Sequence, residues 1–362
     1  MDDYISTENM AVGYGGKALI ENISLHVRRG EIMTLIGPNG SGKSTILKSI
    51  IRQLGLIRGT VYLDGRDMAR MTEAEVATRL SVLMTERIRP ELMTCEDVVS
   101  TGRYPYTGRL GILSQEDRRI VRESLALVHA QELADQDFSR ISDGQRQRIL
   151  LARALCQEPE IMVLDEPTSF LDIRHKLELL SILKDMVQKR RLAVIMSLHE
   201  LDLAQKISDY VVCVRGGAIE RYGPPEEIFT SEYVMSLYGV TSGSYNAAFG
   251  CLELERVPGT PEVFVIGGGG SGIGVYRRLQ RQGIPFAAGV LHENDVDYPV
   301  ARALAAQVVS EKSFEPISDD TLHQAEQCME RCNRVICCLR SFGPVNEKNR
   351  LLLERAKALG KL

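Results

Sequence analysis

The sequence predicts an α/β protein of two domains, and three observations support this fold class. Over residues 1–255, short β-rich runs alternate with helical periods, as where the run at 31–37 leads into a helix. From about 87–155 the pattern is mostly helical. After the prolines and glycine of 256–261, an apolar run starts a new strand–turn–helix unit. We therefore expect a first domain over 1–255, with a largely parallel sheet and a helical subdomain at about 87–155, and a smaller α/β domain over 256–362.

Length and composition agree with two domains and exclude some classes of partner. A chain of 362 residues exceeds the usual size of one domain. Its 44 basic and 48 acidic residues nearly balance, so it has no large positive field to hold nucleic acid. Eight cysteines without a short disulfide framework, and a start without an apolar signal segment, predict a protein of the reducing cytosol. Because no apolar run reaches the roughly 18 residues that span a bilayer, we expect any membrane role to depend on a partner.

The glycine-rich loop at 37–45, Gly-Pro-Asn-Gly-Ser-Gly-Lys-Ser-Thr, is the most specific motif of the chain. It follows an apolar run and precedes a helical period, which is the context that a phosphate-binding P-loop needs. Its glycines let backbone N–H groups face a polyphosphate at the N-terminus of a helix. Lys43 is expected to contact the β- and γ-phosphates, and Ser44 to give its hydroxyl to Mg²⁺. The expected nucleotide-binding residues of this loop are Gly37, Pro38, Asn39, Gly40, Ser41, Gly42, Lys43, Ser44 and Thr45.

Two carboxylates end the apolar run at 161–167, Ile-Met-Val-Leu-Asp-Glu-Pro. Buried strands rarely end in this way unless the carboxylates manage a cation or a proton. We expect Asp165 to help hold Mg²⁺, and Glu166 to orient and polarise the water that attacks the phosphate.

The two motifs, in this order, resemble those of the ABC transporter ATPases over residues 1 to about 240. The resemblance implies a P-loop NTPase fold of ABC type, with a mixed sheet core and a helical subdomain, that hydrolyses ATP with Mg²⁺. The run at 141–145, Ile-Ser-Asp-Gly-Gln, is similar to the family signature, whose serine and glycine amides meet the γ-phosphate of ATP held by a second subunit. A head-to-tail homodimer is therefore implied. In this chain the residues that match the family signature are Ser142, Asp143, Gly144 and Gln145.

Three further residues match family motifs in their sequence context. Asp172 ends Ser-Phe-Leu-Asp, which resembles the D-loop that communicates across the dimer. His199 follows an apolar run and resembles the switch histidine, whose imidazole can donate to phosphate and order the attacking water. Tyr14 matches the aromatic residue that stacks on adenine, for which any π face serves.

Two positions depart from the family pattern. Asp143 stands where the signature usually has glycine, and a carboxylate near a phosphate must turn away or weaken closure around ATP. The Q-loop glutamine is also missing, and Thr85 occupies its expected position with Glu86 beside it. Either side chain offers an oxygen for Mg²⁺ or its water, although threonine is the shorter of the two.

The run at 97–106 resembles the motors of iron-siderophore, haem and cobalamin importers. Its Arg-Tyr-Pro-Tyr cluster at 103–106 predicts a groove for a partner's short helix, and a packed loop tip is the alternative. This resemblance implies a motor subunit at the cytoplasmic face of the cell membrane. Its partners would be integral membrane permease subunits and, indirectly, an extracytoplasmic substrate-binding protein. The alternative function is a soluble ABC-type regulatory ATPase whose C-terminal domain senses a nucleotide or redox ligand.

The second domain is expected to be Rossmann-like. Its apolar run at 262–267 leads into Gly-x-Gly-x-x-Gly at Gly267, Gly269 and Gly272, and Glu293 follows a second apolar run where a ribose-binding acid would lie. These four residues are therefore candidates for a nucleotide or anion site. Such glycines also serve close packing of a strand on a helix in folds that bind nothing, and the pattern leaves both possibilities open.

The cysteines of the second domain suggest packing more than metal binding. Cys328 and Cys332 share one face if their segment is helical, whereas Cys337 and Cys338 point to opposite faces of a strand. Free cysteine is among the most buried residue types, so we expect these thiols to fill the core.

Overall fold

The computed structural model describes residues 3–84, 92–108 and 111–362. Contacts divide the chain into two compact units, Met1–Thr230 and Ser231–Leu362. Residues 231–255, which the sequence predicts to end the first domain, thus belong by their contacts to the second unit. Part of the reason is an ion pair between Arg277 and Glu253 within that unit.

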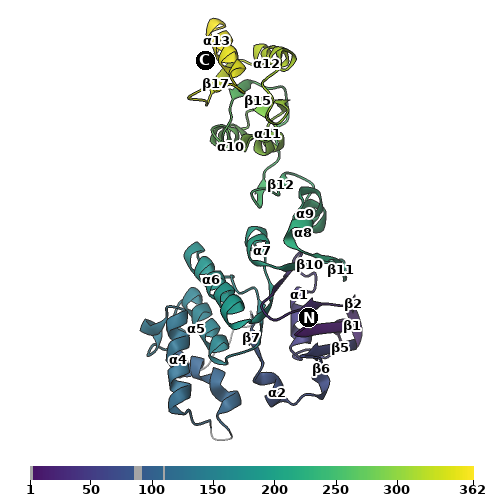
Figure 1. The fold of residues 1–362 in the computed structure, drawn as a ribbon, viewed down its shortest axis with the longest axis vertical. Coiled ribbons are helices and arrows are strands. Elements are labelled where there is room, and N and C mark those ends of the chain that lie inside the picture. The colour runs from purple at the N-terminus through teal and green to yellow at the C-terminus, as the bar shows by residue number, and fades with distance from the viewer. Residues whose placement is uncertain (1–2, 85–91, 109–110) are drawn as a thin grey trace. The chain divides into compact units, whose positions relative to one another are not determined.

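The first unit contains two β-sheets (Figure 1). One is antiparallel, in the order β2–β1–β5–β6 with β3 on β1, and it is built from β1 (Ile5–Tyr14), β2 (Lys17–Ile23), β3 (His26–Val27), β5 (Arg58–Leu63) and β6 (Arg66–Asp67). The other has the order β11–β10–β4–β9–β8–β7, and it is built from β4 (Ile32–Ile36), β7 (Leu80–Leu83), β8 (Ile161–Asp165), β9 (Ala193–Ser197), β10 (Tyr210–Arg215) and β11 (Ala218–Gly223). All neighbours in this second sheet are parallel except β10 and β11, so the predicted mixed sheet core is confirmed.

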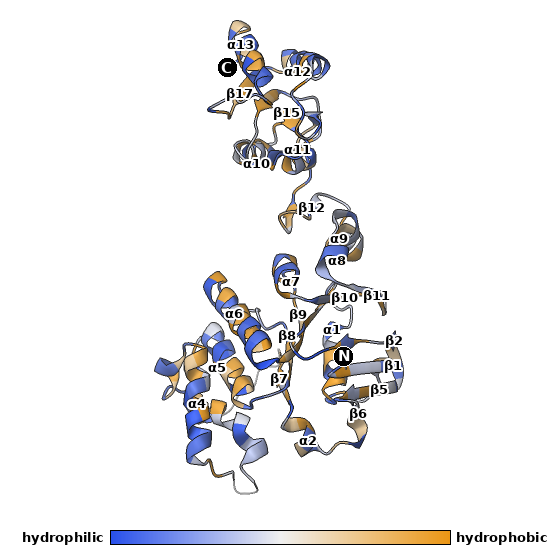
Figure 2. Ribbon diagram, viewed as in Figure 1, coloured by the Kyte–Doolittle hydropathy of each residue, from blue (hydrophilic) through white to orange (hydrophobic). Residues whose placement is uncertain are grey.

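The core of the first unit lies between these sheets. Helix α1 (Lys43–Ile50) contacts β1 of one sheet and β8 and β9 of the other, and its Ile46 and Leu47 are fully buried. Strands β8 and β9 are buried at every position, and Figure 2 shows them as hydrophobic, as expected of parallel strands covered on both faces. Outside the helical subdomain, the unit also contains α2 (Glu73–Ala77), α6 (Ile173–Arg190), α7 (Leu201–Ile207), α8 (Pro225–Ile228) and the short helix η1 (Met68–Arg70).

The predicted helical subdomain is present, and side chains cap its helices. Its elements are α3 (Cys95–Ser100), η2 (Thr101–Tyr106), α4 (Gln115–Leu127), η3 (Gln131–Leu133), η4 (Phe138–Arg140) and α5 (Asp143–Cys156). Ser114 and Asp117 form a reciprocal capping box at the start of α4. Within the described ranges, no helix combines the length and apolar character that crossing a bilayer requires.

The structure places Arg103 inside this subdomain, so the cation of the cluster at 103–106 does not face a partner, whereas Tyr104 and Tyr106 remain 58% and 42% exposed. Its guanidinium donates to Asp117 Oδ1 at 2.8 Å, to Glu158 Oε2 at 2.9 Å and to the carbonyl oxygen of Cys156 at 2.9 Å. The same group lies 4.1 Å from the ring centroid of Tyr106. Because Arg103 is only 5% exposed, it acts as an internal cation that holds this loop.

Replacing Arg103 by alanine is expected to lower the free energy of unfolding of the first unit by about 3 kcal/mol, because the Asp117 carboxylate keeps its burial and loses its cation. Calorimetry of the full chain measures this change. Arg119→Ala on α4 is the matched control, since Arg119 pairs with Glu116 and Glu123 at the surface and its removal should leave the melting temperature nearly unchanged. Equal melting temperatures for the two variants would contradict the expected role of Arg103.

The second unit is built around a parallel sheet in the order β16–β15–β14–β17. In chain order this is third, second, first and fourth, which is a doubly wound arrangement and confirms the predicted Rossmann-like domain. Its strands are β14 (Val263–Ile266), β15 (Phe286–His292), β16 (Gln307–Glu311) and β17 (Arg334–Cys337), and a hairpin of β12 (Ser244–Asn246) and β13 (Cys251–Glu253) precedes them. Its helices are α9 (Ser231–Tyr238), α10 (Ile273–Arg281), α11 (Asp297–Leu304), α12 (Asp319–Arg331) and α13 (Lys348–Ala358).

Two apolar clusters cover the two faces of this sheet. Residues of α10 and α11 form one cluster, and residues of α12 and α13 form the other. Cys328 and Cys332 are 4% and 1% exposed in the second cluster. Cys337 packs against that cluster and Cys338 against the opposite one, as the alternation of a strand predicts. These thiols therefore contribute to packing.

The stability of the second unit is expected to fall between pH 4.5 and pH 2 because of Glu311. Backbone N–H groups of Ser318 at 2.8 Å and Lys312 at 3.1 Å donate to its carboxylate, and these bonds lower the pKa of Glu311 to about 2. A folded-state pKa below the unfolded value means that the carboxylate stabilises the fold above about pH 4.3 and loses this effect as it is protonated. We expect about 2 kcal/mol less stability at pH 2.5 than at pH 6 from this group. Calorimetry of Glu311→Gln should show a weaker pH dependence, whereas Glu315→Gln in the same loop should behave as the parent.

Candidate functional site

The glycine-rich loop lies between β4 and α1, as the sequence predicts. Gly37 and Gly42 have φ values of 146° and 103°, which side-chain-bearing residues rarely adopt. Space is also limited, because a Cβ on Gly37 would lie 2.1 Å from the carbonyl oxygen of Val214. Lys43 is 5% exposed, and its Nζ donates to the carbonyl oxygens of Gly37 at 2.8 Å and Pro38 at 3.1 Å. The lysine is thus held over the loop, where a polyphosphate could replace the carbonyls as its partner.

A pocket of about 500 Å³ opens above this loop. It brings together the glycine loop with the residues that the sequence analysis assigns to other motifs. The lining consists of Tyr14, Leu19, Asn39, Gly40, Ser41, Gly42, Lys43, Ser44, Thr45, Glu166 and His199. Its volume is in the range of small-molecule and cofactor pockets, and its lysine suits an anionic ligand.

Asp165 does not line the pocket itself; it is 4% exposed and contacts Ser44, which does. Its Oδ1 accepts hydrogen bonds from the hydroxyls of Ser44 at 3.1 Å and Ser197 at 2.7 Å. Two hydroxyls and a carboxylate are hard oxygen donors, so this group fits Mg²⁺ by its chemistry. Burial lowers the pKa of Lys43, and the nearby charges of Glu166 and Asp165 oppose that shift.

Glu166 and His199 form a close pair at the edge of the pocket, with His199 Nε2 and Glu166 Oε1 2.5 Å apart. Glu166 has a φ of 50°, in the left-handed region, and its N–H donates to Ser197 Oγ at 2.9 Å. The hydroxyl of Ser169 donates to its other carboxylate oxygen at 3.1 Å. A carboxylate and an imidazole in contact can hold a water molecule and move its proton. The strained turn thus directs the carboxylate away from its strand and toward the pocket.

Tyr14 lies at the rim of the pocket with 57% of its surface exposed. Its hydroxyl and that of Thr45 are 3.3 Å apart, which fixes the position of the phenol end. The ring face remains accessible to a flat ligand.

The signature and D-loop residues do not line this pocket. Ser142 caps α5 through a capping box with Gln145, and Gly144 lies in its first turn. Asp172 caps α6 by accepting a hydrogen bond from the His175 N–H at 2.9 Å. In one chain these residues therefore form a separate surface, and the Q-loop positions Thr85 and Glu86 lie outside the described residues.

The Asp143 carboxylate turns along its own helix. Its Oδ1 accepts a hydrogen bond from Arg146 Nη1 at 2.5 Å, one turn further into α5. The sequence allows this carboxylate either to turn away from the phosphate or to weaken closure around ATP. In the structure it is turned toward a cation of its own helix.

Three residues that support the site are missed by motif analysis. Ser197 and Ser169 donate hydrogen bonds to Asp165 and Glu166, and Gln147 donates from α5 to the carbonyl oxygen of Pro167 at 3.1 Å. Ser197 could have been noticed in the sequence, because it is the polar residue within the apolar run that precedes His199. The parallel strands β8 and β9 pair Asp165 with Ser197 in register, at the carboxyl edge of the sheet.

The glycine loop of the second unit, between β14 and α10, is occupied by carboxylates of its own chain. Asp297 Oδ2 accepts hydrogen bonds from the N–H groups of Gly268 at 2.7 Å and Gly272 at 2.9 Å. Asp295 accepts from the Gly269 N–H at 2.9 Å, and burial raises the pKa of Asp297. An anionic ligand would have to displace both carboxylates. Glu293 is exposed after β15, where the sequence predicts it, and Gly267 lies in the same loop.

Comparisons with known proteins agree with these motifs. A family model described as ABC transporter matches residues 20–169, and a model of the MJ0874 family matches residues 286–362 of the C-terminal domain. The uncharacterized ABC transporter ATP-binding protein MJ0873 of Methanocaldococcus jannaschii is 42% identical over 76% of this chain and 95% of its own length.

Relatives with assigned transport roles are also similar to this chain. The iron(3+)-hydroxamate import ATP-binding protein FhuC of Bacillus subtilis is 35% identical over 65% of this chain and 88% of its own. The cobalamin import ATP-binding protein BtuD of Halobacterium salinarum is 30% identical over 89% of this chain and 82% of its own.

A solved structure shows the same fold. The dimeric post-hydrolysis state of the ATP-binding cassette MJ0796, bound to ADP and Pi, covers 61% of this chain and 98% of its own at 24% identity, with a TM-score of 0.55. The predicted fold and the order of the motifs thus agree with the comparisons. The chain therefore belongs to the ATP-binding subunits of ABC transporters and is an ATPase of that family.

Proposed function

We propose that this chain is the ATP-hydrolysing motor of an ABC importer for iron complexes, such as a siderophore or haem, or for cobalamin. The observation that carries the proposal is the single pocket in which Lys43 and the glycine loop meet Glu166 and His199. The importer assignment is supported by relatives such as FhuC and BtuD.

Each group at the pocket has a role in hydrolysis under this proposal. Tyr14 stacks on adenine, and the N–H groups of the loop hold the phosphates with Lys43. Ser44 and Asp165 would hold Mg²⁺, which supplies positive charge at the phosphates when it is bound. Glu166 orients the attacking water and accepts its proton, and His199 donates to the γ-phosphate.

The surface that carries the signature supports a homodimer. Ser142 and Gly144 lie outside their own chain's pocket, so under this proposal a second copy brings its signature to the ATP. Three large apolar side chains at the D-loop and the start of α6 support such an interface. Phe170, Ile173 and Leu177 are 67%, 80% and 57% exposed. Such a row of apolar residues is unusual on a surface that stays in contact with water.

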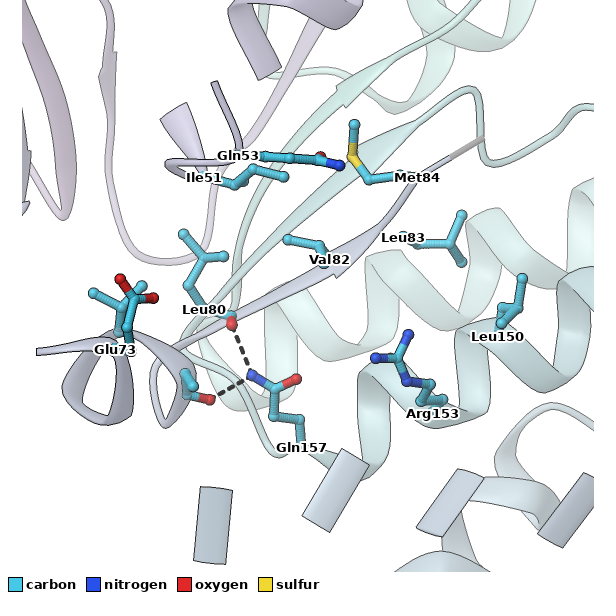
Figure 3. A pocket seen from close by; sticks show the side chains of 12 residues that line it. Ile51, Gln53, Glu73, Leu80, Val82, Leu83, Met84, Leu150, Arg153 and Gln157 are labelled. Carbon is cyan, nitrogen blue, oxygen red and sulfur yellow. Dashed lines mark hydrogen bonds between the residues drawn. The ribbon is translucent and has the colours of Figure 1, made fainter. Parts of the chain in front are cut away.

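A groove in the first unit supports docking of a permease at the cytoplasmic face of the membrane (Figure 3). Its volume is about 490 Å³, and Arg153 of α5 and Gln157, which follows the end of α5, face β7 across it. Gln157 Nε2 donates to the carbonyl oxygens of Ala77 at 2.5 Å and Leu80 at 2.7 Å, which ties the helical subdomain to the sheet. The groove is large enough for the side chains of a short helix. We propose this groove as the partner site in preference to the cluster at 103–106, because Arg103 of that cluster is buried.

The proposal is tested by purifying tagged Glu166→Gln protein from native membranes with ATP and identifying the retained polypeptides. Recovery of a polytopic permease, with an extracytoplasmic substrate-binding protein joining on reconstitution, supports the importer. Recovery of soluble partners only, from a protein that still binds ATP, would replace it with a soluble regulatory ATPase.

A charge in the groove is expected to prevent permease binding. Met84→Glu places a carboxylate beside Val82 in its lining, and we expect the amount of co-purified permease to fall at least tenfold. Ala74→Glu on the exposed face of α2 is the matched control, because Ala74 does not line the groove. The measurement is quantitative immunoblotting of the membrane-purified complex. Equal recovery with both variants would exclude the groove as the docking site.

A further inference from the structure

Arg153 brings a positive charge to the groove between α5 and β7. We propose that this guanidinium binds an acidic side chain on the short helix of the permease and so determines which permease docks. The partner is then a permease whose cytoplasmic helix presents an aspartate or a glutamate toward α5. This inference rests on the proposed function, because it requires the groove to be the permease site.

One nitrogen of the Arg153 guanidinium is held by its own chain, and the other two are not. Nε donates to Thr101 Oγ1 at 2.9 Å, and the Thr101 hydroxyl donates in turn to the carbonyl oxygen of Val98 at 2.7 Å. Among the residues that the structure describes, none forms a hydrogen bond or an ion pair with Nη1 or Nη2 of Arg153. These two nitrogens point the planar fork that suits a carboxylate into the groove, where Figure 3 shows the side chain.

The walls around this cation are mostly apolar. Val82 and Leu83 of β7 and Leu150 of α5 line the groove with it (Figure 3). Arg153 is half-buried, and burial lowers its pKa. Removing a cation from water without a counter-charge is costly, and a carboxylate in contact with it offsets part of that cost. Apolar walls also strengthen the attraction between the two charges.

Other charges nearby have partners within the chain. Glu73 is the acidic residue among the described residues that line the groove, and it pairs with Arg52 Nη2 at 3.0 Å. Figure 3 shows Glu73 at the opposite end of the groove from Arg153. Arg103, the buried arginine of the same subdomain, has two carboxylates of its own chain. The chain thus supplies counter-charges for Arg52 and Arg103, whereas Arg153 receives one hydroxyl, and its counter-charge is left to a partner.

The inference is tested in the full-length Glu166→Gln chain, purified from native membranes with ATP. We expect Arg153→Gln to lower the amount of co-purified permease about tenfold, and Arg153→Lys, which keeps the cation, to stay within about threefold of the parent. Quantitative immunoblotting measures the permease. Arg122→Gln on α4 is the matched control and should recover as much permease as the parent. Its Nε also donates to an oxygen atom of its own chain, but the side chain is exposed and does not line the groove.

Carbodiimide crosslinking of the Arg153→Lys complex identifies the partner of the charge. The reagent activates a carboxylate, which then forms an amide with an amine in direct contact. Mass spectrometry should therefore find the introduced amine joined to an aspartate or a glutamate of the permease. A crosslink to a carboxylate of its own chain, or none in a complex that forms, would overturn the inference.

Failure of this inference is distinct from failure of the proposed function. Equal recovery of the permease with Arg153→Gln and with the parent would overturn the charge recognition alone and leave the importer assignment standing. Loss of permease with Arg153→Lys as severe as with Arg153→Gln would also overturn it, because the cation would then not be the feature that matters. A parent that retains no permease would overturn the importer assignment and this inference with it.

Discussion

Replacing Glu166 by glutamine is expected to lower the rate of ATP hydrolysis about a thousandfold while ATP binding is retained. The amide cannot accept the proton of the attacking water, although it has nearly the same size and keeps the contact with Ser169. The backbone at this position is left-handed, with φ of 50°, and its conformational strain is the same for glutamate and glutamine. The expected loss is therefore one of chemistry and not of folding.

Steady-state phosphate release and equilibrium ATP binding, measured on the same protein, separate the two effects. Glu178→Gln on α6 is the matched control, since Glu178 pairs with Arg174 away from the pocket and should keep the parent's rate. We also expect the Glu166 variant to accumulate as an ATP-bound dimer. If it hydrolysed ATP at the parent's rate, Glu166 would be excluded as the base.

The ATP site was predictable because its parts are local motifs at one edge of one sheet. The glycine loop, the Asp165–Glu166 pair and His199 each follow an apolar run, and the carboxyl ends of parallel strands β4, β8 and β9 meet at that edge. In this part of the chain, the position of a motif directly after a strand therefore predicts which edge of the sheet it reaches. The helical subdomain was predictable for a similar reason, since its capping boxes are local.

Contacts between distant residues were not predictable in the same way. Arg103 resembles an interface residue in sequence, and only the fold brings Asp117 and Glu158 to it. In the C-terminal domain, the Gly-x-Gly-x-x-Gly pattern is the same whether a phosphate or a carboxylate occupies its N–H groups. The carboxylates of Asp295 and Asp297 come from the turn after β15 and the start of α11, so the sequence pattern of the loop contains no sign of them.

Replacing Lys43 by methionine is expected to weaken ATP binding about a thousandfold, because two charge-assisted contacts to phosphate, each worth roughly 1.5–3 kcal/mol, are lost. Methionine preserves the packing of a side chain that is only 5% exposed. It cannot donate to Gly37 and Pro38, so the loop also loses two hydrogen bonds that hold its shape without nucleotide. Titration with a fluorescent ATP analogue measures the affinity.

Two controls separate loss of charge from loss of fold in this variant. Lys48→Ala, on the same helix and outside the pocket, should bind ATP as the parent does. An unchanged melting temperature of Lys43→Met without nucleotide would show that the loop and α1 are intact. Because a bound ligand stabilises the folded state by RT ln(1 + [L]/Kd), ATP at a concentration well above the parent's Kd should stabilise the parent and Lys48→Ala but hardly Lys43→Met. Stabilisation of all three by ATP would mean that the backbone of the loop, not the lysine, provides most of the binding energy.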